Sequence, residues 1–181
     1  EIIATPDTDP AALAAIARFA DLHLGKSVVP ANDRPNFIAN RIGAFSLLNT
    51  IRVMPQQGLT IEEVDALTGK PLGWPKTGTF RLADMVGLDV LGSVVRNFAA
   101  NTKDERSDLQ LPAFLETMLE KKWFGDKTGQ GFYRKERGAK DDERLTLDLA
   151  TFEYRPAQKP KLAALDATKP IESLPERIRV L

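Results

Sequence analysis

The feature that most constrains this chain is a long helical segment with apolar residues on two opposite faces. The segment begins at Pro35 and continues to Met54, and Pro55 is expected to end it. Helical spacing puts one apolar set on one face and a second set on the other, namely Phe37, Ala44, Leu47 and Ile51 against Ile38, Ile42 and Phe45. A helix that is apolar on both sides is buried on both sides, so we expect it inside a domain core or against another subunit.

Helix-start and helix-stop residues predict four more helices around this one. Asp9 and Pro10 suit the first helical turn of one, and a capping box from Thr60 to Glu63 begins another. Gly87 divides the longest of the four. The expected helices cover residues 10–25, 60–69, 79–100 and 112–125. Residues 145–149 and 152–154 are weakly strand-like, and a short helix begins at residue 173. We therefore expect an all-α domain with an irregular C-terminal tail.

Composition excludes several classes of function. The 181 residues contain 25 basic and 25 acidic side chains, so the formal net charge is zero, and we expect no nucleic-acid partner. The chain has no cysteine and one histidine, which excludes a thiolate or multi-histidine metal site. No apolar run approaches the roughly 20 residues of a membrane helix, so we expect no membrane insertion and a cytoplasmic location. The Lys127-Thr128 pair lacks the preceding glycine of a phosphate loop, and we assign no residue to cofactor or metal binding.

The two ends of the chain predict that it is a piece of a longer protein. Residues 1–4 read as the end of a strand, and a strand needs a partner. Residues 134–144 are rich in charge and nearly free of apolar side chains, which is typical of a linker. We expect the helical body between these two segments.

Asn40 is the candidate functional residue within the long helix. It lies on the apolar face, three residues after Phe37 and four before Ala44. A buried amide must find hydrogen-bond partners, because an unpaired one costs about 1–3 kcal/mol. Asn40 is therefore either a structural residue bonded to a neighbouring loop or an amide kept free for a ligand carbonyl. The residues alone favour the structural role.

Three motifs resemble those of 3-hydroxyacyl-CoA dehydrogenases, in the same order. Residues 33–41, DRPNFIANR, resemble the family's D-x-P-G-F-I-x-N-R. Residues 78–89, GTFRLADMVGLD, resemble G-P-F-x-L-x-D-x-x-G-L-D, and residues 127–133, KTGQGFY, resemble K-T-G-x-G-F-Y. The resemblance covers residues 1 to about 134.

The resemblance implies a helical dimerisation domain of the 6-phosphogluconate dehydrogenase C-terminal type. Residues 1–4 would be the last strand of an absent NAD-binding Rossmann domain, residues 5–134 the helical domain, and residues 135–181 a charged linker and the start of a further segment. It also implies an enzyme that oxidises (S)-3-hydroxyacyl-CoA in fatty-acid β-oxidation as a homodimer. NAD and the catalytic histidine would belong to the absent domain, so the fragment alone would be inactive.

The same resemblance assigns roles to individual residues. Glu1 would orient the catalytic histidine, and Asn40 would contact the substrate beside it, which reverses the preference for a structural Asn40. Thr79 and Phe80 would also bind substrate.

Two residues depart from the family motifs, since Asn36 replaces a glycine and Thr79 a proline. Residues 74–77, which lead into the second motif, and the C-terminal tail resemble the corresponding segments of long multifunctional fatty-oxidation proteins. Two alternatives stay open: a non-catalytic helical dimerisation module, and a related NAD(P)-dependent hydroxyacid dehydrogenase domain.

Overall fold

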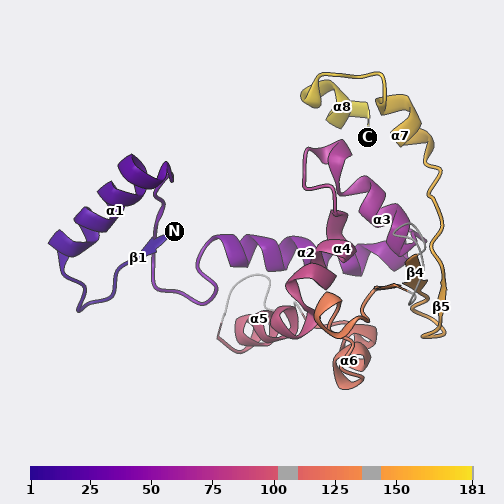
Figure 1. Cartoon of the computed structure of the whole chain (residues 1–181), viewed down its shortest axis with the longest axis horizontal. Coiled ribbons are helices and arrows are strands. Elements are labelled where there is room, and N and C mark those ends of the chain that lie inside the picture. Colours follow the sequence, from indigo (N-terminus) through magenta and orange to yellow (C-terminus); the bar gives the residue numbers. More distant parts are fainter. Residues whose placement is uncertain (102–109, 136–143, 181) are drawn as a thin grey trace.

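The computed structural model describes residues 1–101, 110–135 and 144–180. The described chain is mostly helical, with one two-stranded and one three-stranded sheet. Figure 1 shows the N-terminal unit reaching out to one side, with α2 leading from it into a group of shorter helices. The three-stranded sheet lies at the far side of that group, and the last two helices lie at the top of the view.

The N-terminal unit is a β-α-β arrangement. Its elements are β1 (Ile2–Ile3), α1 (Pro10–Leu24) and β2 (Pro30–Ala31). The expected opening strand is present, and it pairs in parallel with β2. The caps of α1 are confirmed: Asp9 accepts a hydrogen bond from the Ala11 amide at 2.9 Å, and Gly25 ends the helix in the left-handed conformation. No residue of α1 is buried.

The long helix differs from the prediction at both ends. Helix α2 spans Ala39–Gln56, so it begins four residues later than expected and includes Pro55 in its last turn. The late start has a backbone cause, because Asn36 and Phe37 have φ values of 64° and 47°. A right-handed helix cannot include residues with these positive φ values, so α2 begins after them.

The shorter helices begin close to the predicted residues, although the last of them ends at Glu120 and not near residue 125. The capping box is confirmed: the Thr60 amide donates to Glu63 Oε2 at 2.8 Å, and the Glu63 amide donates to Thr60 Oγ1 at 3.3 Å. Gly87 divides the expected long stretch into two helices, as predicted, with φ at 101°. The bounds are α3 Ile61–Leu67, η1 Lys70–Leu72, α4 Gly78–Val86, α5 Leu88–Asn101 and α6 Ala113–Glu120.

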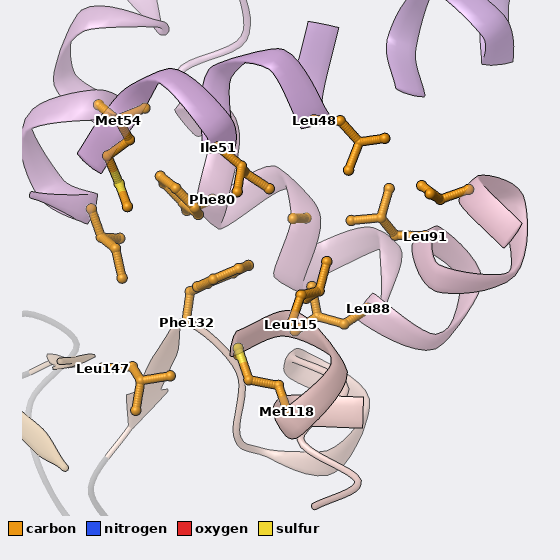
Figure 2. Close-up of a cluster of buried hydrophobic side chains, with 14 of the residues drawn as sticks. Leu48, Ile51, Met54, Phe80, Leu88, Leu91, Leu115, Met118, Phe132 and Leu147 are labelled. Atoms are coloured by element: carbon orange, nitrogen blue, oxygen red, sulfur yellow. The ribbon is translucent and has the colours of Figure 1, made fainter. Parts of the chain in front are cut away.

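The hydrophobic core forms where α2 to α6 meet, and Figure 2 shows its side chains. The rings of Phe80 and Phe132 are fully buried and meet edge to face with centroids 4.6 Å apart. Leu147 joins this core with 1% of its surface exposed. Within the described residues, each of the helices α2 to α6 contributes at least one buried apolar residue to this core. These residues include Leu48, Ile51, Val64, Ala83, Leu88 and Leu115.

The expectation of an irregular tail is wrong, and the all-α description is incomplete. The strands β3 (Tyr133–Lys135), β4 (Arg144–Leu147) and β5 (Tyr154–Pro156) form an antiparallel sheet in the order β3-β4-β5. The Tyr154 hydroxyl donates to the Gly131 carbonyl at 2.6 Å, which ties the tail to the helical body. Most of the predicted linker, residues 136–143, lies outside the described residues.

The last two helices pack back on the body. They are α7 (Ala163–Thr168) and α8 (Leu174–Val180), and α8 contacts η1. The predicted helix start at Ser173 is confirmed, since its carbonyl accepts from the Arg177 amide at 2.9 Å. Within the described residues, no helix is long and apolar enough to cross a membrane.

Candidate substrate-binding site

The N-terminus of α2 is held by the carboxylate of Glu1. Its two oxygens accept the backbone amides of Ile38 at 3.1 Å and Ala39 at 2.6 Å. These amide donors hold the pKa of Glu1 below its usual range. Glu1 is exposed, so a further donor can reach it from solvent. The bonds join the residue before β1 to the start of α2, one residue from Asn40.

The turn before α2 explains how Asn36 can stand where the family motif has glycine. Asn36 has a φ of 64°, a left-handed conformation that glycine adopts freely and that asparagine tolerates better than most residues. Its side-chain amide also donates to the Val94 carbonyl in α5, at 3.3 Å. The substitution therefore preserves the turn that starts α2.

Asn40 is exposed, and its side chain has no hydrogen-bond partner among the described residues. It lines a groove of about 680 Å³ between α2, α4 and α5. The structural role that the sequence alone favoured requires a bond to a neighbouring loop, and no such bond is present within the described chain. The amide is placed to donate to a ligand in the groove.

Thr79 and Phe80, which the resemblance placed beside the substrate, are separated by the direction of their side chains. Thr79 lines the same groove as Asn40, and its hydroxyl donates to Thr68 Oγ1 at 2.8 Å. Phe80 is fully buried against Phe132. The structure thus places Asn40 and Thr79 in one groove, and Glu1 is bonded to the start of the helix that carries Asn40. The Phe80 ring lies in the core. A substrate contact by that ring stays a prediction, and its burial does not favour it.

The third motif is structural where the structure describes it. Residues Asp126–Thr128 form a short 3-10 helix, η2, and Asp126 makes a two-bond ion pair with Arg81 at 2.6 and 2.7 Å. Lys127 pairs with Asp89 at 2.5 Å. The loop is a turn that leads into Phe132, whose ring is buried in the core. In the described part of the chain, no group of three or more histidine, cysteine or acidic residues could hold a metal ion.

Comparison with known proteins places this geometry in a family. The family model for the C-terminal domain of 3-hydroxyacyl-CoA dehydrogenase matches residues 37–135, which is more than half of the chain. The chain belongs to the 3-hydroxyacyl-CoA dehydrogenase family, as its C-terminal domain. A probable 3-hydroxyacyl-CoA dehydrogenase of Bacillus subtilis is 43% identical over 182 residues, covering 100% of this chain and 23% of the relative. A second, from Deinococcus radiodurans, is 40% identical and covers 81% of this chain and 42% of the relative.

Solved structures show the same relationship for the dehydrogenase domain. The crystal structure of FadB2 from M. tuberculosis has a TM-score of 0.65 at 35% identity, covering 74% of this chain and 46% of that chain. The structure of (S)-3-hydroxybutyryl-CoA dehydrogenase PaaH1 from Ralstonia eutropha has a TM-score of 0.62 at 26% identity, covering 71% and 44%. The chain therefore spans less than half the length of these relatives.

Two aspartates that were given no role from the sequence, the half-buried Asp65 and the buried Asp84, hold the domain together. Asp65 in α3 accepts the amides of Phe80 at 2.6 Å and Arg81 at 3.0 Å, and the Tyr133 hydroxyl at 2.7 Å. It therefore caps α4 and binds the strand β3 at the same time. Burial raises the pKa of Asp65 to about 6, against the lowering effect of these donors.

Asp84 joins the second family motif to the third. Its carboxylate accepts the amides of Phe132 at 2.9 Å and Tyr133 at 2.8 Å, with 1% of the residue exposed. Gly125 and Gly131 pack so closely on Asp84 that a Cβ at either position would collide with it. Asp84 belongs to the second motif and Gly131 to the third, so this contact joins residues 47 positions apart, a pairing that the sequence alone does not show.

Proposed function

We propose that this chain is the substrate-side and dimerisation domain of an NAD-dependent (S)-3-hydroxyacyl-CoA dehydrogenase of fatty-acid β-oxidation. The observation that carries the proposal is Asn40, an exposed amide without a partner among the described residues, at the edge of an apolar groove. Its neighbour in space, Glu1, is exposed at the same end of α2. The three family motifs support the same assignment.

In the proposed reaction, each of these residues has a separate task. The Asn40 amide donates a hydrogen bond to the oxygen that gains negative charge, either the developing ketone or the thioester carbonyl. Glu1 accepts the ring N–H of a histidine supplied by the NAD-binding domain, which fixes the histidine tautomer so that its other nitrogen can remove the hydroxyl proton. NAD accepts the hydride when it is bound.

We assign the NAD site to a domain outside this chain. A dinucleotide-binding β-α-β unit has a glycine-rich turn between its first strand and its helix. The turn between β1 and α1 here is Ala-Thr-Pro-Asp-Thr-Asp, which contains no glycine. Calorimetric titration of the 181-residue chain with NAD should give no binding signal, and a micromolar affinity would contradict this assignment.

The role of Asn40 is tested in the full-length protein that carries this chain. We expect Asn40→Ala to lower kcat/KM for a 3-hydroxyacyl-CoA by about two to three orders of magnitude, because one preorganised donor is worth roughly 2.7–4 kcal/mol. Because the side chain is exposed and unpaired within the described chain, the melting temperature should barely change. Asn49→Ala on the same helix, away from the groove, is the matched control.

The outcomes separate the enzyme from the alternatives. A strongly destabilised Asn40→Ala protein with normal specific activity would show that the asparagine is structural. A wild-type full-length protein without activity on any 3-hydroxyacyl-CoA would favour the non-catalytic dimerisation module, and activity on another hydroxyacid would favour the related dehydrogenase.

Homodimerisation through the helical body is part of the proposal. Leu88, Val95 and Phe98 of α5 do not contribute to the dimer surface, because the chain buries them in its own core. Phe45 on α2 and Met85 on α4 are still exposed, at 37% and 54%. Sedimentation at micromolar concentration should show a dimer, and a monomer of 20 kDa would refute this part.

A further inference from the structure

Gly43 lies in the interior of α2, where no close contact in the fold requires a glycine. A glycine destabilises a helix relative to alanine, because the unfolded chain has more freedom to lose. A close neighbour explains Gly92 in α5, where a Cβ would come within 2.8 Å of Leu119. At Gly43 a Cβ would meet no atom within 4 Å. The missing side chain therefore leaves open space, and that space lies in the groove beside Asn40.

The groove has the size and the polarity of a site for an amphipathic small molecule. Its volume of about 680 Å³ falls in the range of ligand pockets. Gly43 follows Asn40 by three residues, so both lie on the same face of α2. The rest of the lining is almost entirely apolar and comes from three helices, with Leu47, Leu82, Val86, Val90, Leu91 and Val94 among its residues.

Trp74 forms a wall of the same groove from outside these helices. It follows η1, and its backbone amide donates to the Gly69 carbonyl at 3.1 Å. The preceding residue, Gly73, lies against Leu174 of α8, so the C-terminal helix supports this loop from behind. The indole is 50% exposed although it is large and apolar, as a side chain at the rim of a binding groove would be.

We infer that this groove receives the alkyl chain of the acyl substrate, and that Gly43 and Trp74 set how long a chain it accepts. The inference rests on the function proposed above and goes beyond it to chain-length specificity. A ligand with a carbonyl at one end and an alkyl tail matches the groove, because Asn40 offers a donor at one position and the lining beyond it is apolar. The space left by Gly43 is where the first methylenes after the carbonyl pass α2.

The test compares kcat/KM of the full-length protein on 3-hydroxyacyl-CoA substrates with acyl chains of four, eight, twelve and sixteen carbons. Gly43→Leu places in the groove a side chain that favours the helix, and its Cβ meets no atom within 4 Å. Burial of one methylene contributes about a fourfold gain in affinity. We therefore expect the ratio of the sixteen-carbon to the four-carbon kcat/KM to fall at least tenfold.

Further variants keep the test independent of any one substitution. Gly43→Ala should lower the ratio less than Gly43→Leu, because it fills less of the groove. Trp74→Ala removes one wall and should change the ratio by several-fold. Ile178→Ala is the matched control, since Ile178 is as exposed as Trp74, at 50%, and is absent from the groove lining. It should leave the ratio unchanged.

Three other outcomes would overturn the chain-length role or the function on which it rests. Equal losses at every chain length in the Gly43 and Trp74 variants would overturn the chain-length role and leave the dehydrogenase function standing. An unchanged ratio together with loss of the dimer in sedimentation would assign the groove to an interface between copies of the chain. A wild-type protein inactive on all four substrates would refute the proposed function itself.

Discussion

Replacing Asp84 by alanine should destabilise the chain by about 2–6 kcal/mol. The carboxylate is 1% exposed and accepts two backbone amides, from Phe132 and Tyr133. Alanine removes both acceptors, and each amide left without a partner in a buried position costs about 1–3 kcal/mol. The two amides belong to the segment that carries the Phe132 ring into the core, so the loss is transmitted to the packing around Phe80.

Equilibrium unfolding in urea, followed by circular dichroism, measures this effect as a change in the free energy of unfolding. Asp166→Ala is the control, because it removes the same group from an exposed ion pair with Lys169. Exposed pairs contribute about 0–1 kcal/mol, so the control should change little. If Asp84→Ala lost no more stability than Asp166→Ala, the view that this carboxylate joins the two family motifs would be refuted.

Three further predictions concern the buried carboxylates of Asp84 and Glu62. Gly131→Ala should lower the free energy of unfolding by about 1–3 kcal/mol in the same assay, because its Cβ would collide with the Asp84 carboxylate. An unchanged urea midpoint would show that the carboxylate can move aside. Burial raises the pKa of Asp84 to about 7, above its ordinary value of 3.8, so the folded state binds the proton more tightly. The free energy of unfolding of the wild type relative to Asp84→Asn should therefore be greatest below about pH 4 and fall as the pH rises to 7. Urea titrations that give the same difference at every pH in this range would contradict the prediction. Arg155→Ala should lower the free energy of unfolding by about 1–3 kcal/mol, because it leaves Glu62, 7% exposed, without the guanidinium that donates to it at 2.6 and 3.0 Å. Thermal unfolding of this variant and of Glu62→Gln measures the contribution of the pair. No change in either variant would show that the tail sheet is not anchored there.

Local signals in the sequence were sufficient to predict most helices. The Asp9 cap, the Thr60–Glu63 capping box and the break at Gly87 all depend on residues within one helical turn of each other, so they can be identified without knowing the fold. The start of α2 could not be predicted in this way. Pro35 suits a first helical turn, but two residues with positive φ follow it, and the bond from Asn36 to Val94 that accompanies them joins positions 58 residues apart.

The tail shows the same difference over a longer distance. Residues 145–149 and 152–154 had weak strand character, and their charged surroundings were typical of a linker. Strand pairing with β3, the burial of Leu147 and the ion pair from Arg155 to Glu62 make this segment part of the domain. Each of these contacts depends on which residues face each other across the sheet, which a short run of residues does not encode alone.

The sequence by itself determined the helical character of the chain, its helix caps and its membership of a family, because capping and motif spacing are local. It also singled out Asn40 as the residue to examine. Only the tertiary structure decided that this amide is exposed and unpaired within the described chain, that Phe80 points into the core while Thr79 borders the groove, and that Gly43 opens onto free space. The reason is physical: whether a side chain is buried, bonded or free depends on what packs against it, and here those neighbours come from helices that lie far apart in the sequence.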